Sequence, residues 1–203
     1  MPRRAAGARQ IVQFASHLKA QVGAKDAARA LGVSTSTLYR TIRGQGLTSR
    51  KAVAVWRDRA FEAPRRQVSI EAGKGLRGMP RKALAQGLSA ALGRDVSPRE
   101  AARLRARALR GNLDAATAAR LERVETTITS DSGTEVRLIS SPDMARALHP
   151  NSAGYGKQYA SAQDAANDLG STTAHSYLVI VAMPDGTFRA YDEDTTRNAA
   201  RKR

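Results

Sequence analysis

Ala24–Gly44, AKDAARALGVSTSTLYRTIRG, is the stretch that decides the fold of the front of this chain. Its first half places two alanines and Leu31 on one side of a helix, where small side chains let a second helix approach closely. Gly32 follows at the position where a helix end favours a residue that tolerates positive φ, and Ser34 is suited to cap the next helix. The stretch therefore predicts two short helices joined by a tight turn, a helix-turn-helix.

The second of these helices has an apolar side and a polar side. Leu38 and Ile42 lie four residues apart and point inward. The polar side carries short hydroxyls first and arginines later, which suits entry into the major groove of DNA. The residues predicted to contact DNA here are Lys25, Ser34, Thr35, Ser36, Thr37, Tyr39, Arg40 and Arg43. The alternative is an ordinary helical hairpin whose polar side is only hydrated.

The run Ser36-Thr37-Leu38-Tyr39-Arg40, after Gly32-Val33, resembles the start of the recognition helix in resolvase and invertase serine recombinases. It is also similar to helix-turn-helix segments of Fis-type and transposase proteins. The resemblance implies that Ser36 and Arg40 contact base edges and that Tyr39 contacts the DNA backbone. It is confined to the first 45 or so residues and includes no counterpart of the recombinases' catalytic domain, so recombinase chemistry is not implied.

The charge of the chain is strongly positive and unevenly distributed. The formal net charge is +16 over 203 residues. Residues 1–124 contain 26 Lys and Arg and 8 Asp and Glu, whereas residues 125–203 contain 8 and 10. This asymmetry favours a nucleic-acid-binding front and a differently used back. Aromatic residues are sparse, which argues against single-strand binding by base stacking.

Several classes of protein are excluded by composition. The chain has no cysteine, so disulfides and thiolate metal sites are ruled out. No apolar run approaches the roughly 20 residues of a membrane span. The basic N-terminus has no hydrophobic region after it and does not predict a secretory signal. We therefore expect a cytoplasmic, nucleoid-associated protein without metal, cofactor or membrane partner, and no small-molecule ligand is evident.

Basic segments flank the predicted motif on both sides. Residues 1–9 form an arm whose Arg3 and Arg4 either enter the minor groove, as a similar arm does in the recombinases, or belong to an unstructured tail. The domain covers residues 10–63, with a first helix over 10–22 and a last helix that Pro64 ends. Residues 64–79 predict a basic, glycine-rich linker. Its candidate phosphate contacts are Arg65, Arg66, Lys74 and Arg77.

Residues 80–124 predict a second basic domain of three helices, over 80–92, 98–110 and 114–124. Ser97 and Glu100 form a capping box at the start of the middle helix. Parts of this region repeat the front of the chain loosely, so the middle helix is either the reader of a second helix-turn-helix or part of an accessory bundle. The arginines that it exposes are Arg99, Arg103 and Arg107, together with Arg105.

Residues 125–198 predict a small acidic ββααββ domain, followed by a basic tail over 199–203. A hairpin is expected over 126–139, helices over 142–148 and 161–169, and a polar loop over 149–159 between them. Strands are expected over 177–183 and 187–191, and the apolar run Leu178–Val181 predicts a central strand. The acidic residues Asp185, Asp192, Glu193 and Asp194 fit a turn and a strand end better than a metal site.

Together these features predict an α+β multidomain, non-enzymatic protein that binds double-stranded DNA at specific sequences. The acidic domain would join copies into a homodimer or higher oligomer. The protein would act as a regulator, or as an origin- or partition-site binder of a mobile element. A small-ligand sensor is an alternative role for the acidic domain. Two alternatives remain for the whole protein: a sequence-neutral coating protein, and a DNA-end protein with a C-terminal hydroxyl as nucleotide acceptor. Ala30–Ser34 is similar to a segment of terminal proteins of linear actinobacterial replicons. This resemblance implies priming of replication from such a hydroxyl, but it identifies no residue for that role.

Overall fold

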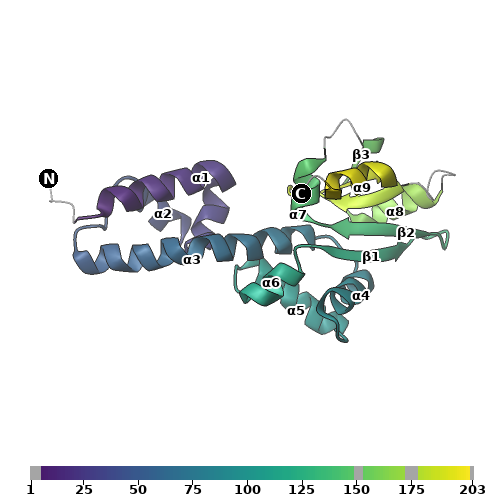
Figure 1. Ribbon diagram of the computed structural model, residues 1–203, viewed down its shortest axis with the longest axis horizontal. Coiled ribbons are helices and arrows are strands. Elements are labelled where there is room, and N and C mark those ends of the chain that lie inside the picture. The colour runs from purple at the N-terminus through teal and green to yellow at the C-terminus, as the bar shows by residue number, and fades with distance from the viewer. Residues whose placement is uncertain (1–5, 149–152, 172–177, 202–203) are drawn as a thin grey trace. The chain divides into compact units, whose positions relative to one another are not determined.

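The protein is described by a computed structural model that covers residues 6–148, 153–171 and 178–201 (Figure 1). These residues form nine α-helices and five β-strands, which confirms the expected mixed α+β class. They group into two compact units. The first unit holds Met1–Ile70 and Arg110–Asn112, and the second holds Glu71–Leu109 and Leu113–Arg203.

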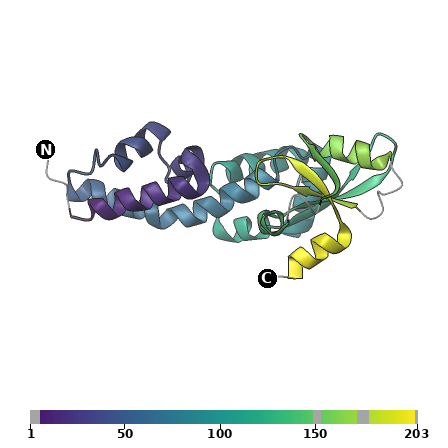
Figure 2. The same ribbon diagram turned by 90° about the horizontal axis from the view of Figure 1, so that it is seen from above.

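The first unit consists of helices packed on one small apolar core (Figures 1 and 2). It contains α1 (Ala8–Ala30), α2 (Thr35–Ile42) and the first part of α3 (Arg50–Gly75). Gly23 interrupts α1 with φ 81° and ψ 161°, so this element is two consecutive helices, as the sequence predicts. Leu31, Leu38 and Leu47 are fully buried in the core, and each contributes roughly 1.5–3 kcal/mol by leaving water.

The prediction that Pro64 ends a helix and begins a linker is wrong. α3 runs from Arg50 to Gly75 with Pro64 inside it. A proline inside a helix costs about 3 kcal/mol, because it removes one backbone hydrogen bond and crowds the preceding turn. Ala63 and Ile70 are buried in the core of the first unit, and Leu76, directly after α3, is buried in that of the second. Packing on both sides of the proline therefore outweighs its local cost.

The glycines of the predicted linker serve close packing. A Cβ atom at Gly73 would lie 2.6 Å from the backbone nitrogen of Leu109 and 2.9 Å from the carbonyl carbon of Ala108. At Gly75 a Cβ would collide with the Ser140 hydroxyl. These glycines let the end of α3 approach its neighbours in the second unit. Composition alone does not distinguish this role from a flexible linker.

The second unit is built on a five-stranded mixed sheet in the order β1-β2-β4-β5-β3. Its strands are β1 (Val124–Thr129), β2 (Glu135–Ser140), β3 (Ala153–Tyr159), β4 (Leu178–Ala182) and β5 (Phe188–Asp192). β2 and β4 are parallel, with Leu138 opposite Ile180, and the other neighbours are antiparallel. The strand predicted to be central, β4, lies in the middle of the sheet and is buried along its whole length.

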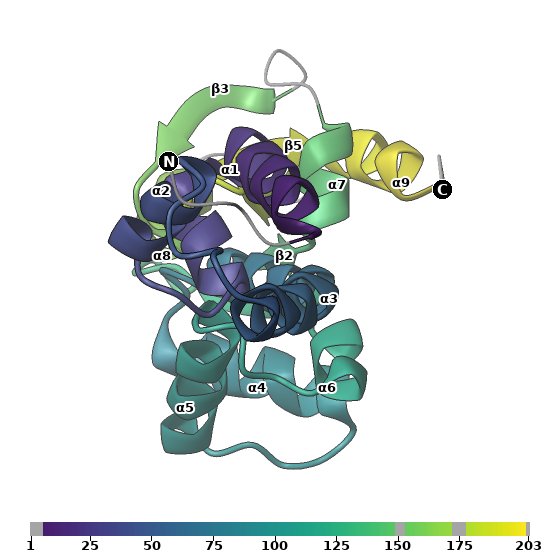
Figure 3. The ribbon, with the colours of Figure 1, turned by 90° about the vertical axis from the view of Figure 1, so that its left-hand side faces the viewer.

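Helices cover both faces of this sheet. They are α4 (Arg81–Leu92), α5 (Pro98–Leu109), α6 (Ala115–Arg120), α7 (Pro142–Ala147), α8 (Ala162–Gly170) and α9 (Glu193–Arg201). In the view of Figure 3, α4, α5 and α6 lie below the sheet, and α7 and α9 lie to its right. Leu138 and Ile180 share a core with α4–α6 and α8, while Ile139 and Val181 share a core with α7 and α9. The period-two alternation of a strand explains this division.

Two elements of the second unit differ from the prediction. The segment expected to be a loop contains β3, an edge strand paired with β5, while residues 149–152 lie outside the described part. Glu193–Arg201, expected as a strand end and tail, is the helix α9. Its inward residues, Thr196 and Ala199, are too small to give an apolar signal in the sequence. Acidic residues in its first turn and Arg201 in its last suit the helix dipole.

The structure also divides the back of the chain differently from the predicted domains. Leu84 and Leu104, from the region predicted as a separate helical domain, lie in the same core as Ile128 and Phe188. A Cβ atom at Gly87 on α4 would lie 2.8 Å from a methyl group of Val124. The predicted boundary at residue 124 thus falls inside one core, in which α4 lies directly on β1.

Candidate nucleic-acid interface

The turn between the second half of α1 and α2 is fixed by backbone hydrogen bonds. Gly32 has φ 63° and donates its N–H to the carbonyl of Arg29 at 3.0 Å. Val33 donates to the carbonyl of Ala28 at 2.9 Å. This pair of bonds is a Schellman motif, which satisfies carbonyls at the helix end and requires a residue that tolerates positive φ. The expected role of Gly32 is confirmed.

α2 begins with a side-chain cap. The Ser34 hydroxyl accepts a hydrogen bond from the Thr37 N–H at 3.1 Å, which confirms Ser34 as the cap. The Thr37 hydroxyl lies 2.9 Å from the same oxygen. Ser34 and Thr37 therefore set the start of α2, and their hydroxyls are engaged with each other.

The two sides of α2 are arranged as the sequence predicts. Leu38 is fully buried and Ile42 is half-buried. The exposed residues are Thr35, Ser36, Thr37, Tyr39, Arg40 and Arg43, together with Lys25 on the preceding helix. No acidic residue occurs between Asp26 and Asp58. Within the described part of the chain, Arg40 and Arg43 form no salt bridge.

Lys19 adds a cation to this face that the sequence did not reveal. Its ammonium lies 4.9 Å from the centre of the Tyr39 ring, a cation–π contact. Lys19 is on the first half of α1, and only the packing of α1 with α2 brings it to Tyr39. Sequence spacing contains no signal for this contact.

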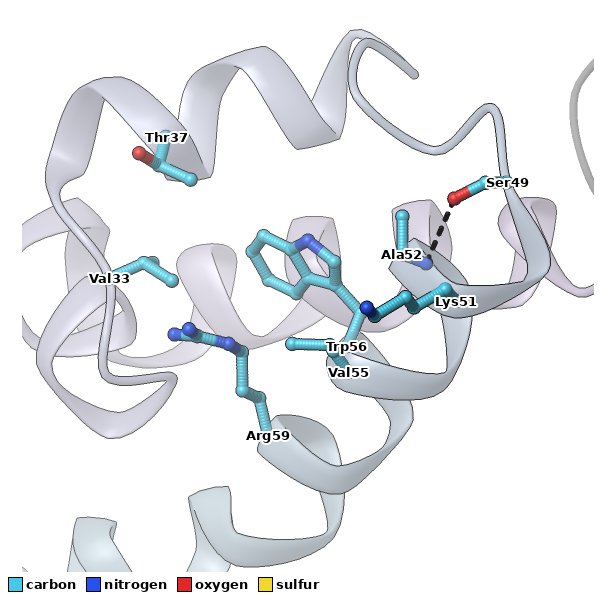
Figure 4. Close-up of a pocket in the computed structure, with 8 residues that line it drawn as sticks. All are labelled: Val33, Thr37, Ser49, Lys51, Ala52, Val55, Trp56 and Arg59. Carbon is cyan, nitrogen blue, oxygen red and sulfur yellow. Dashed lines mark hydrogen bonds between the residues drawn. The ribbon is translucent and has the colours of Figure 1, made fainter.

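α3 holds the turn from the other side through Arg59. Its guanidinium donates to the carbonyls of Leu31 at 3.1 Å and Gly32 at 2.5 Å, and it lies 6.0 Å from the Trp56 ring. These carbonyls end a helix, where partial negative charge favours a cation. Figure 4 shows the Arg59 guanidinium beside Val33. Trp56 is a core residue, as predicted, but the role of Arg59 was missed.

An open pocket of about 370 Å³ lies between the start of α2 and the start of α3 (Figure 4). Its floor is apolar, with Val33, Ala52 and the Trp56 ring, and Lys51 and Arg59 supply positive charge. The remaining lining residues are Thr37, Ser49 and Val55. The Ser49 hydroxyl accepts the Ala52 N–H at 3.1 Å, which fixes the first turn of α3 beside the pocket.

The four cations of the predicted linker are divided between the two units, with Arg65 and Arg66 in the first. Arg65 is exposed and lies 3.6 Å from Glu62. Arg66 is half-buried, with its backbone and Cβ atom against Gly111 and its guanidinium beside Gly32. Lys74 is half-buried and Arg77 is exposed, and both belong to the second unit. Arg3 and Arg4 of the predicted arm lie outside the described residues.

α5 presents a separate arginine surface in the second unit. Arg99, Arg103 and Arg107 are exposed at four-residue intervals. Arg99 and Arg103, with Arg81 of α4, line an open pocket of about 600 Å³ whose other lining residues are Pro98, Ala102 and Ala106. Arg105 instead is half-buried and donates to the carbonyl of Met79 at 3.4 Å. We call Arg99, Arg103, Arg107 and the residues that line this pocket the α5 surface. It combines arginines with alanines and contains no hydroxyl group.

The start of α5 contains an ion pair where a reciprocal capping box was expected. The Ser97 hydroxyl accepts the Glu100 N–H at 3.2 Å, which is half of that motif. The Glu100 carboxylate accepts from Arg94 at 2.6 Å, and this hydrogen bond lowers the pKa of Glu100. The pair takes Arg94 out of the set of cations open to an anionic partner.

Several of the described acidic and tyrosine side chains of the second unit have structural partners. Asp185 accepts the Thr187 N–H at 2.9 Å, and Glu193 accepts from Arg137 at 2.6 Å. Tyr159 donates to Asp168 at 2.6 Å, which lowers the pKa of that carboxyl. Burial raises the pKa of Tyr191. Neither tyrosine hydroxyl is placed as an exposed acceptor for a nucleotide.

Comparison with known proteins leaves the class of this chain to be argued from its own residues. No protein-family model, curated protein or solved structure matches it. Among the described residues, no helix is long and apolar enough to cross a membrane. The described residues also bring together no group of three His, Asp or Glu side chains that could hold a metal ion.

Proposed function

We propose that this chain is a sequence-specific double-stranded DNA-binding protein and that Lys25–Arg43 is its helix-turn-helix. α2 would be the recognition helix and would enter the major groove. The observation that carries the proposal is the exposed face of α2, where hydroxyls precede arginines in a stretch without acidic residues. A helix that only covers a core does not require this order of side chains.

The side chains of α2 differ in the contacts that they can make. Arg40 can donate two hydrogen bonds to the O6 and N7 atoms of guanine, and the short Ser36 hydroxyl can reach a base edge. The Lys19 ammonium lies over the Tyr39 ring, so the Tyr39 hydroxyl and the Lys19 charge together suit a phosphate. Arg3 and Arg4 would follow the minor groove beside the helix.

The α5 surface supports a second contact of a different kind. Arg81, Arg99 and Arg103 surround one pocket, which suits a phosphate group. Alanines occupy the positions between the arginines, so this surface offers few groups for reading bases. We therefore assign α5 to backbone binding, which favours the accessory-bundle alternative over a second reader.

The proposal accounts for binding without any catalytic step. It fits a regulator, or a protein that marks an origin or partition site of a mobile element, associated with the nucleoid. The sequence-neutral coating protein remains the main competitor, because the α5 surface alone would bind any duplex.

Selection of duplexes from a random library, followed by footprinting of the selected site within a long DNA, tests the proposal. We expect one enriched motif and discrete protection at that motif. Enrichment of no motif, together with continuous protection along the DNA, would identify a coating protein instead. Incubation with labelled nucleotide, polymerase and Mg²⁺ provides the third arm, because a covalent adduct would identify a DNA-end protein.

A further inference from the structure

Exposed apolar side chains are concentrated in the first unit. Among the described residues, the large apolar side chains with substantial exposure are Tyr39, Val55, Phe61 and Val68, and all belong to that unit. Tyr39 contacts Lys19, whereas the other three lie on α3. Phe61 stands out, because 84% of its surface is exposed. The second unit, where the sequence predicted self-association, shows no comparable side chain in its described residues.

The exposed side of α3 has the spacing of a helix-pairing surface. Ala54, Phe61 and Val68 are exposed and lie seven residues apart, so they fall on one line along the helix. Asp58 and Arg65 are exposed along one side of this line, and Arg57 and Pro64 along the other. We call these seven residues the α3 ridge. A central apolar line with charges beside it is the pattern of a helix that packs on another helix.

We propose that the α3 ridge binds the α3 ridge of a second copy of this chain, with the two helices antiparallel about a two-fold axis at Phe61. In this arrangement residue i lies opposite residue 122 − i of the second copy. Phe61 meets Phe61, and the small Ala54 lies opposite the larger Val68, so bulk is matched at each level. Such self-complementarity is what a two-fold interface requires.

The charges beside the ridge fit the same arrangement. Asp58 would lie next to Arg65 of the second copy on one side of the contact, and the two-fold axis repeats the pair. Arg57 is at the same level as Arg65 of the second copy, but the two arginines lie on different sides of the ridge and do not meet. Arg57 instead meets Pro64 of the second copy. Within the described part, Asp58 forms no salt bridge, and Arg65 only approaches Glu62 at 3.6 Å. A parallel two-fold arrangement would instead place Asp58 beside Arg57 of the second copy, so the Asp58–Arg65 pair is particular to the antiparallel one.

Self-association through α3 gives each dimer two copies of α2. A two-fold dimer presents its two recognition helices to inverted half-sites. The inference does not depend on the proposed function, however, because self-association is measured without DNA. A dimer that binds no DNA would contradict only the proposed function, and a monomer that binds DNA would contradict only this inference.

Sedimentation equilibrium of the full chain without DNA is the first test, with 21.8 kDa as the mass of one copy. We expect twice that mass for the native chain and the mass of one copy for Phe61→Glu. Because Phe61 is exposed, this substitution leaves the fold intact, and an unchanged circular dichroism spectrum checks that. A native chain of monomer mass at its highest soluble concentration would overturn the proposal, as would a Phe61→Glu dimer.

Charge exchange then tests the antiparallel register. Asp58→Arg and Arg65→Asp should each raise the dimer dissociation constant at least tenfold, because each places like charges together. The double variant should restore it to within about threefold of the native value. Additive losses in the double variant would contradict the pairing of these two residues.

Thiol crosslinking tests the two-fold axis, since the chain contains no cysteine. Phe61→Cys should form a covalent dimer with a short bifunctional thiol reagent. Val55→Cys is the matched control, because Val55 is 44% exposed on the same helix but lies off the ridge. Equal crosslinking of the two variants, or none of Phe61→Cys in a chain of dimer mass, would overturn the arrangement.

Discussion

α2 and α5 are short amphipathic helices that begin alike and differ in what they expose. In each, a serine hydroxyl accepts a hydrogen bond from the N–H three residues later. Ser34 accepts from Thr37 at 3.1 Å, and Ser97 accepts from Glu100 at 3.2 Å. α2 then exposes hydroxyls, a tyrosine and two arginines, whereas α5 exposes arginines separated by alanines. A shared way of starting a helix therefore supports two different surfaces, and we propose that one reads bases and the other binds phosphates.

The two helices also differ in how they are held. α2 has eight residues and depends on the turn before it, on Leu38 beneath it and on Arg59 beside that turn. α5 has twelve residues and packs against α4 through Leu104 in the larger core of the second unit. Since a short helix obtains most of its stability from packing, α2 should be more sensitive to loss of a single support.

The largest effect should come from removing the buried anchor of each helix. Leu38→Ala should cost about 2–5 kcal/mol of unfolding free energy in the first unit, because it leaves a cavity under α2. Leu104→Ala should cost less, because Leu104 is 7% exposed and Leu38 is fully buried. Urea denaturation followed by Trp56 fluorescence measures the unfolding free energy of the first unit. Equal losses for the two variants by this probe would show that the units unfold together.

The next effect separates base reading from backbone binding. Arg40→Ala should cost about 1–3 kcal/mol at the selected DNA site and much less on random duplex, which relaxes specificity. Arg103→Ala should weaken both duplexes equally and reduce the slope of log K against log salt by about one. Fluorescence anisotropy at several salt concentrations measures both quantities.

Two results would break the contrast between α2 and α5. Equal losses on specific and random duplex for Arg40→Ala would remove its base-reading role. A loss confined to the specific site for Arg103→Ala would instead make α5 a second reader. Arg105→Ala is a useful comparison, because Arg105 binds the Met79 carbonyl and should affect stability more than the salt slope.

Sequence reasoning succeeded where local rules decide the structure. The turn at Gly32, the cap at Ser34, the buried position of Leu38 and the central strand β4 follow from residue type and spacing within a few positions. The exposure of the predicted residues on α2 follows in the same way. The contacts of these residues with DNA stay predictions.

Sequence reasoning failed where packing between distant segments decides. Pro64 and Gly75 led to the prediction of a helix end and a linker. Buried residues on both sides of Pro64 keep α3 helical, and the missing side chain of Gly75 leaves room for Ser140. Lys19 reaches Tyr39, and Arg59 reaches the carbonyls of the turn, across 20 and 27 or 28 residues of chain. Helix periodicity describes which side of a helix is buried, but not which partner lies against it.

Removing the Arg59 contact should have a smaller effect than removing Leu38. Arg59→Ala should cost about 1–2 kcal/mol of unfolding free energy, because two charge-assisted hydrogen bonds to backbone carbonyls are lost at a partly exposed site. DNA affinity should also fall, because the turn that positions α2 becomes less ordered, even though Arg59 is not on the exposed face of α2. Arg50→Ala, at the exposed start of the same helix, is the matched control and should leave stability unchanged.

The capping serines allow the same change in both helices. Ser34→Ala and Ser97→Ala should each cost about 1 kcal/mol, because each leaves an N–H of the first turn without its acceptor. Only Ser34→Ala should also weaken specific DNA binding, since Thr37 loses its hydroxyl partner at the exposed start of α2. Ser34→Asp should restore stability, because aspartate is an equally good cap. Urea denaturation and anisotropy together separate the two effects.

The smallest expected effect is a difference between the first turns of α2 and α5 in how their stability depends on pH. Arg94 donates to Glu100 in the first turn of α5, and this bond lowers the pKa of Glu100 in the folded protein. The stabilisation is therefore complete above the ordinary glutamate pKa of about 4.3 and is lost as the pH falls through the lower folded value. The first turn of α2 contains no acidic residue, so its start should not respond in this range. An NMR titration of the Glu100 carboxyl should show its pKa rising in Arg94→Ala, while the Thr37 amide signal stays constant. An unchanged Glu100 titration in that variant would mean that the ion pair does not set the difference between the two helices.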